Sequence, residues 1–87
     1  MIQVLVPSQL HAYTGGVSRL EAAGSVIAEV LDDLDQRFPG LKFRIIDEQD
    51  RVRPHMRLFV GKTAARDIRA RLRDGDELLI FGALSGG

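Results

Sequence analysis

Apolar residues recur through residues 26–38 with the spacing of an α-helix. They are separated by steps of one, three and four residues, which places them on one face of a helix. They are Val26, Ile27, Val30, Leu31, Leu34 and Phe38. The polar positions that fall opposite are Asp32, Asp33, Asp35 and Gln36. Acidic runs of this kind usually form a solvated face, so the pattern predicts an amphipathic helix over residues 25–38.

The residues that flank this helix support its boundaries. The hydroxyl of Ser25 can accept a hydrogen bond from a free backbone N–H of the first turn, so Ser25 is the predicted N-cap. Pro39 and Gly40 come directly after the last apolar position and end the helix.

Short runs of apolar and β-branched residues predict the strands. They span residues 2–6, 17–22, 56–60 and 77–81. Pro7 ends the first run because proline cannot donate to a sheet ladder. The loop over residues 8–16 closes on Thr14-Gly15-Gly16, a strong turn signal. The expected order is strand, strand, helix, strand, then a turn or short strand after Gly61-Lys62, and a final strand.

The rest of the chain is less regular. Residues 41–54 are irregular and highly charged, with Phe43, Ile45 and Ile46 as possible anchors to the core. Residues 63–73 are rich in arginine, and Asp74-Gly75-Asp76 predicts a turn. With 87 residues and no linker, the sequence predicts one domain over residues 1–87.

Alternation along the strands divides their side chains between two faces. One face should pack on the helix and form the core with it. The predicted core contains Val4, Val6, Val26, Val30, Leu34, Leu58, Val60, Leu78 and Ile80. The side chains between these positions must then face away from the helix.

Composition excludes several functional classes. The chain has no cysteine, which rules out disulfides, thiolate nucleophiles and cysteine-ligated metals. His11 and His55 lie far apart without ligand spacing, so we expect no metal site. No signal peptide or membrane-spanning run is present, and we expect a cytoplasmic protein that does not contact membranes.

Charge is divided unevenly along the chain. Residues 1–50 carry 4 Lys/Arg against 8 Asp/Glu, and residues 51–87 carry 8 against 4, so the balances are −4 and +4. Such asymmetry can mark a docking surface for a charged partner. The sequence pI is near 6.7 with one tyrosine and no tryptophan, which argues against nucleic-acid binding.

The sequence ends on Gly86-Gly87, directly after the final apolar strand and a few small residues. A segment without Cβ atoms can enter a narrow cleft and present its terminal carboxylate there. With an α-carboxyl pKa of about 3.5, that group is ionised at neutral pH. Residues 83–87, predicted to be a flexible tail, would extend roughly 17 Å beyond the sheet.

Several short motifs, in this order, carry a family resemblance. They are Met1-Ile2-Gln3-Val4-Leu5-Val6-Pro7, Thr14-Gly15-Gly16, Gly24-Ser25-Val26, Arg37-Phe38-Pro39-Gly40-Leu41, Asp74-Gly75-Asp76-Glu77 and Gly86-Gly87. Together they resemble the ThiS/MoaD family of ubiquitin-like prokaryotic sulfur carriers, over essentially the whole chain. The Thr-Gly-Gly loop favours the branch that includes carriers of cysteine and specialised-metabolite biosynthesis. Gly61-Lys62 and Gly82 depart from residues common in the family.

The resemblance implies an α+β fold of the β-grasp type, a mixed sheet of four to five strands packed on one main helix. It also implies that Gly87 is adenylated with ATP by an adenylyltransferase resembling ubiquitin-activating enzymes. A sulfur donor would then displace AMP and leave a thiocarboxylate, which a downstream synthase would use. Gly86 and Ser85 would be required for activation. The chain would be a co-substrate without a permanent cofactor of its own, not an enzyme.

A docking surface for these enzymes follows from the same resemblance. The first and last strands are central neighbours in β-grasp relatives, so their outward side chains would form one patch. It would contain Leu5, Pro7, Phe59, Leu79 and Phe81, with Arg57 and Arg73 at its rim. Soluble monomers seldom keep such an apolar patch uncovered.

Other functions remain open at this stage. Gly87 could instead be joined to target lysines, as in a ubiquitin-like protein modifier. The domain could be a passive β-grasp interaction module. It could also bind nucleic acid through Arg66, Arg69, Arg71 and Arg73, which would make binding steeply salt-dependent. The acceptor of the sulfur could be thiamine thiazole, molybdopterin, cysteine or a specialised metabolite.

Overall fold

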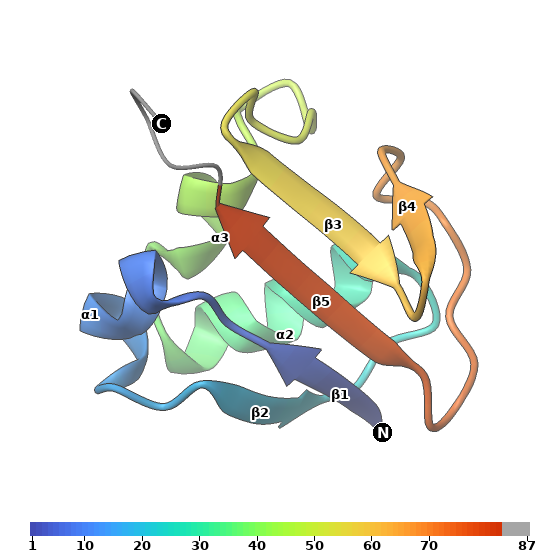
Figure 1. Cartoon of the computed structure of the whole chain (residues 1–87), viewed down its shortest axis with the longest axis horizontal. Coiled ribbons are helices and arrows are strands. Elements are labelled where there is room, and N and C mark those ends of the chain that lie inside the picture. Colours follow the sequence, from blue (N-terminus) through green and yellow to red (C-terminus); the bar gives the residue numbers. More distant parts are fainter. Residues whose placement is uncertain (83–87) are drawn as a thin grey trace.

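Five strands form one mixed sheet in the computed structural model, which describes residues 1–82 (Figure 1). The strands are β1 (Ile2–Leu5), β2 (Arg19–Ala22), β3 (Met56–Val60), β4 (Thr63–Ala65) and β5 (Glu77–Gly82). Their order in the sheet is β2-β1-β5-β3-β4. The central strands β1 and β5 are parallel, and the other neighbours are antiparallel.

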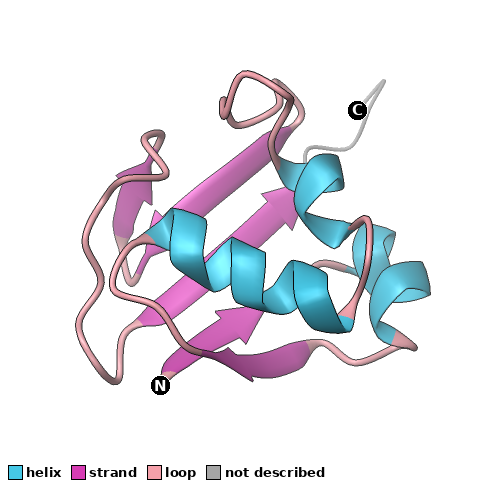
Figure 2. Ribbon diagram, turned by 180° about the vertical axis from the view of Figure 1, so that it is seen from behind, coloured by secondary structure: helices cyan, strands magenta, loops and turns pink. Residues whose placement is uncertain are grey.

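The helices are η1 (Ser8–Leu10), α1 (His11–Thr14), α2 (Ile27–Arg37) and α3 (Leu41–Ile45). Figure 2 shows α2 lying across one face of the sheet, whereas the strands lie in front of α2 in Figure 1. This is the β-grasp arrangement that the sequence predicts, and the fold prediction is confirmed. Within residues 1–82, no helix is long and apolar enough to span a membrane.

The short helices η1, α1 and α3 were not predicted from the sequence. Residues 8–16 form η1 and α1 in place of a plain loop, because Leu10 is buried in the core and ties this segment to the sheet. The left-handed Gly15 (φ 66°) ends α1 by donating its N–H to the carbonyl of His11. Residues 17 and 18 remain outside β2, which is shorter than predicted.

A carboxylate from α2 explains where α3 begins. Gly40 adopts a left-handed conformation (φ 94°) that turns the chain out of α2. Oδ1 of Asp35 then accepts hydrogen bonds from the backbone N–H groups of Gly40 and Lys42, both at 3.1 Å. Asp35 therefore has a structural contact in addition to its position on the solvated face of α2.

The helix α2 begins two residues later and ends one residue earlier than the predicted range of 25–38. Val26 is the N-cap, and Ser25 precedes it. The N–H and hydroxyl of Ser25 both donate to Oε1 of Glu29, at 2.7 and 2.8 Å. These hydrogen bonds hold the pKa of Glu29 below its ordinary value, and the one from the backbone N–H of Ser25 has the larger effect. The N-cap prediction for Ser25 was wrong, because its hydroxyl donates a hydrogen bond to the Glu29 carboxylate and accepts none from a backbone N–H of the first turn.

The core lies between α2 and the sheet, mostly as predicted. Every predicted core residue is buried except Val26 and Val60, which are half-buried. Val26 precedes α2 and forms an isolated bridge with Arg71, and Val60 is the last residue of β3. Of the three possible anchors, Ile45 and Ile46 are buried, whereas the side chain of Phe43 is exposed.

The arginine-rich segment between β4 and β5 is fastened to the first turn of α2. Ile68 and Leu72 are buried, and the carbonyls of Ile68 and Ala70 accept the N–H groups of Ala28 and Ile27. Leu72 in turn donates its N–H to the carbonyl of Ser25 at 2.8 Å. The segment thus closes one end of the core.

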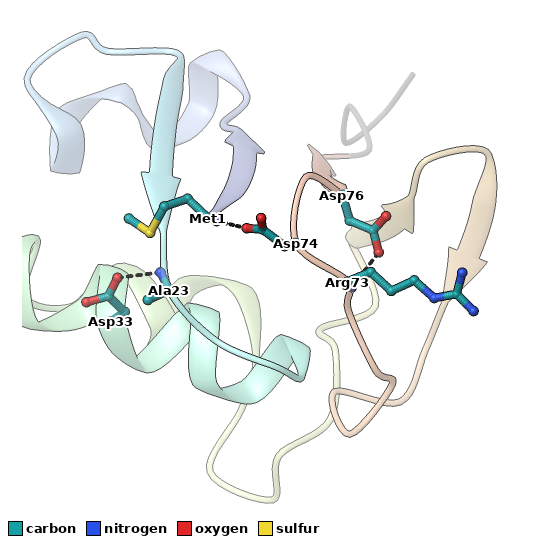
Figure 3. Close-up of polar contacts among 6 residues, drawn as sticks. All are labelled: Met1, Ala23, Asp33, Arg73, Asp74 and Asp76. Carbon is teal, nitrogen blue, oxygen red and sulfur yellow. Dashed lines mark hydrogen bonds and ion pairs between the residues drawn. The ribbon is translucent and has the colours of Figure 1, made fainter.

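The turn before β5 is held next to β1 (Figure 3). The amino group of Met1 forms an ion pair with Asp74, which lowers the pKa of that carboxyl chiefly through the hydrogen bond. Oδ2 of Asp76 accepts the N–H of Arg73 at 2.8 Å. On α2, Oδ2 of Asp33 accepts the N–H of Ala23 at 2.9 Å. The contacts of Met1 with Asp74 and of Arg73 with Asp76 position the start of β5, whereas the contact of Asp33 ties α2 to the residue that follows β2.

Candidate functional site

The last described residue, Gly82, marks the root of the tail at one end of the sheet. It ends β5 and pairs with Met56 of β3. The predicted site of sulfur attachment, Gly87, and its required neighbours Gly86 and Ser85 lie outside the described residues. The structure therefore defines the strand from which the tail leaves and the surface beside it.

Next to this root, the open face of the sheet carries a continuous apolar row. Leu79 on β5 lies between Leu5 on β1 and Phe59 on β3 in the sheet register. All three side chains are half-buried, whereas their neighbours Leu78 and Ile80 are buried on the other face. The strand alternation predicted from the sequence is confirmed.

Phe81 extends the apolar row toward the tail. Its side chain is 49% exposed, and its ring meets that of Phe59 edge-on with the centroids 5.7 Å apart. At the opposite end of the same face, Gln3 lies between Glu21 and Glu77 in the register, and Glu77 forms an ion pair of 3.9 Å with Arg19. The apolar part of the open face is therefore the part nearest the tail.

The two arginines predicted at the rim lie at different ends of the molecule. Arg57 pairs with Phe81, and its Nη1 donates to the carbonyls of Pro54 at 2.6 Å and Met56 at 2.9 Å. Arg73 precedes β5, so a six-residue strand of roughly 20 Å separates it from the root of the tail. Predicting Arg73 at the rim of the apolar patch was wrong, because it precedes β5 and lies at the end of that strand away from Gly82.

The remaining predicted residue, Pro7, is half-buried and follows Leu5 beyond the end of β1. The chain then enters η1, where Gln9 reaches the root of the tail. A Cβ atom added to Gly82 would lie 2.4 Å from Nε2 of Gln9. Gln9 was missed by the sequence analysis because no pattern links η1 to β5. The lack of a side chain at Gly82 makes room for it.

The described residues include four carboxylates whose pKa values lie below the ordinary value. They are those of Glu29, Asp47, Asp67 and Asp74, all on the surface. In the cases of Asp47 and Asp67, backbone N–H donors are the main cause. Within residues 1–82, no group of three or more His, Cys, Asp or Glu side chains is arranged to hold a metal ion.

Comparison with known sequences gives a consistent picture. The sequence profile of the ThiS family matches residues 4–87. The sulfur carrier protein CysO from Mycobacterium tuberculosis is 26% identical over 91 residues, which cover 99% of this chain and 98% of that protein. The same protein from Mycobacterium bovis gives the same values.

Comparison with solved structures agrees. A chain of the Amycolatopsis orientalis BexX/CysO complex superposes with a TM-score of 0.92 and 30% identity, and both chains are covered fully (100%). CysO from Mycobacterium tuberculosis gives 0.90 and 22% identity, with 97% of this chain and 100% of that chain covered. SAMP1 from Haloferax volcanii gives 0.76 and 24% identity, with 99% and 98% covered. The last two likenesses concern the fold alone.

Proposed function

Because this chain belongs to the ThiS family, we propose that it carries sulfur as a thiocarboxylate on Gly87. A carboxylate oxygen of Gly87 attacks the α-phosphorus of ATP, and pyrophosphate leaves with the bonding electron pair. A sulfur nucleophile then attacks the acyl carbon of the adenylate, and AMP departs. The sulfur stays on the carrier until an acceptor enzyme removes it.

The observation that carries this proposal is the apolar row that ends at the root of the tail. Leu5, Leu79 and Phe59 form the row, and Phe81 continues it next to Gly82. A partner that covers this surface can hold the domain still while the tail enters its nucleotide site. Exposed aromatic side chains are common anchors for such contacts.

The catalytic groups would belong to the partners. An adenylyltransferase would supply the ATP site and the magnesium, and a separate sulfur donor would provide the nucleophile. A downstream synthase would bind the loaded carrier through the same face. The relative from Amycolatopsis orientalis was solved as a BexX/CysO complex, which supports a partner protein for this chain.

The direct test is the mass of the protein after reaction. The full chain is incubated with its activating enzyme, ATP, magnesium and sulfide, and the C-terminal peptide is analysed by mass spectrometry. Replacement of one oxygen by sulfur on Gly87 is the expected result. A chain that reacts with ATP but never gains sulfur would contradict the proposal.

A protein modifier is the second candidate, because the fold is also similar to that of SAMP1, a small archaeal modifier protein. Both functions would use the same activated carboxylate. They differ in the product, since a modifier forms an amide with a lysine of another protein. Immunoblots of cell extracts would show higher-mass conjugates that contain this chain, whereas a carrier accumulates as the free thiocarboxylate.

A further inference from the structure

A groove of about 1200 Å³ lies at the sheet edge formed by β3 and β4. The register pairs Leu58 with Ala65, so β4 stops there while β3 continues back to Met56. The loop over residues 49–54 forms one wall, and residues 64–69 form the other. Figure 1 shows both segments on the side of β3 that faces away from β5, the loop near the start of β3 and the β4 segment near its end.

The walls of this groove carry an excess of positive charge. The basic side chains that line it are those of Arg51, Arg53, Arg57, Arg66 and Arg69, against the carboxylates of Asp50 and Asp67. Asp67 accepts a hydrogen bond from Nε of Arg69 at 3.4 Å, which offsets one arginine. Asp47, outside the lining, has its pKa lowered mainly by the N–H of Arg51 and to a smaller extent by the charges of Arg53 and Arg51.

Carbonyl oxygens, not carboxylates, hold two of these guanidinium groups in place. Arg53 donates from Nε to the carbonyl of Phe43 at 2.6 Å and lies over that ring, 4.5 Å from its centroid. Arg57 donates to the carbonyls of Pro54 and Met56. A carbonyl fixes a guanidinium without neutralising it. Within residues 1–82, the ion pairs do not include Arg51, Arg53, Arg57 or Arg66.

The residues that line the groove argue against phosphate groups and nucleobases as its ligands. Apolar side chains contribute to the lining. Ala28, Val52 and Ala65 are half-buried, whereas Met56, Leu58 and Ile68 belong to the core and are almost fully buried. The first N–H groups of α2 are already bonded to the carbonyls of Ile68 and Ala70, so the helix offers no phosphate site here. Phe59 is the single aromatic residue in the lining, which leaves little surface on which nucleobases could stack.

We propose that this groove binds an acidic segment of a partner protein. The apolar side chains of that segment would contact the apolar lining, and its carboxylates would pair with the arginines. Arginine and carboxylate form charge-assisted hydrogen bonds that a preorganised guanidinium makes at low entropic cost. Because Met56 pairs with Gly82, the groove begins one strand away from the root of the tail. The proposal is independent of the chemistry at Gly87.

The test uses the full chain and a fluorescent peptide of about ten residues in which glutamate and leucine alternate, a length set by the reach of an extended segment. Anisotropy should show binding that weakens as salt is raised. The double variant Arg51→Glu, Arg66→Glu reverses one exposed charge on each wall and should bind about tenfold more weakly or worse. The double variant Lys62→Glu, Arg71→Glu reverses two exposed charges outside the groove lining, so it is the matched control and should bind like the original chain.

Thermal unfolding identifies a double variant that does not fold, in which case Arg66→Gln alone provides the comparison. Equal affinity of the folded variant and the original chain would overturn the proposal, as would a peptide that does not bind. Tighter binding of a single-stranded oligonucleotide of equal charge would assign the groove to nucleic acid instead. Self-association that the peptide displaces, seen by analytical ultracentrifugation, would assign it to a second copy. If the double variant loses peptide binding but keeps normal pyrophosphate exchange, the groove proposal is supported and the proposed reaction at Gly87 is unaffected.

Discussion

The two faces of the central strand β5 have the same hydrophobic character but opposite surroundings. Leu78 and Ile80 are fully covered by the helical layer, whereas Leu79 is half-buried and Phe81 is 49% exposed. A sheet that needed only to fold would carry polar side chains on its open face, as it does around Gln3 and Glu77. The apolar half of that face is the part for which we propose a binding role.

Truncating adjacent leucines on β5 gives the sharpest contrast between the faces. Leu78→Ala should lower the free energy of unfolding by about 2–5 kcal/mol, because it leaves a cavity in the core. Leu79→Ala should cost clearly less, since water already reaches that side chain. Urea unfolding of both variants measures the difference. Equal losses would show that the open face also belongs to the core.

The close approach of β2 and α2 gives the next largest effect. A Cβ atom at Gly24 would lie 2.7 Å from the backbone N of Val30, so alanine must push the first turn of α2 away from the sheet. Gly24→Ala should destabilise the domain by about 1–3 kcal/mol. Gly75→Ala offers a contrast without a clash, because nothing lies within 4 Å of its added Cβ and its cost comes only from the left-handed backbone (φ 90°). A Gly24→Ala chain as stable as the original would contradict this packing.

On the open face, the effect should appear in binding and not in stability. Phe81→Ala should weaken binding to the activating enzyme about thirtyfold, which corresponds to about 2 kcal/mol. Phe43→Ala removes a similarly exposed ring on α3 and serves as the control. Calorimetric titration measures the affinity, and thermal unfolding measures the fold. Unchanged affinity would contradict a role for Phe81 in docking, and a collapsed fold would show that its ring also supports the folded structure.

The smallest effect is expected at the exposed start of α2. The folded-state pKa of Glu29 is held below its unfolded value of about 4.3. Its contribution to stability is therefore present above that value and is lost as pH falls through the lower folded pKa. The stability difference between the original chain and Glu29→Gln should shrink below about pH 4. A difference that stays constant in urea unfolding at acidic pH would contradict this.

The sequence was sufficient to predict features that depend on local periodicity. The buried stripe of α2 and the alternation of Leu78, Leu79, Ile80 and Phe81 follow from spacing alone. Features that depend on remote partners were missed or misplaced. Asp35 caps α3 across a turn, and Glu29 takes the hydroxyl of Ser25.

The candidate site shows the same division. The face of each outward residue could be predicted, but contacts with remote segments could not. Gln9 reaches Gly82 from a segment expected to be a loop, whereas the place of Arg73 before the final strand was visible in the sequence and was overlooked. The groove at the sheet edge beside β3 depends on where β4 stops, which the strand register sets and no local pattern encodes.

ATP–pyrophosphate exchange with the activating enzyme is the most direct test of the proposed reaction at Gly87. The full chain should support exchange, and chains that lack Gly87 or carry Gly86→Val should not, while thermal unfolding stays the same. The valine adds a β-branched side chain where the cleft is expected to admit none. Full exchange activity from a chain that ends at Ser85 would contradict the claim that the carboxylate of Gly87 is the reacting group.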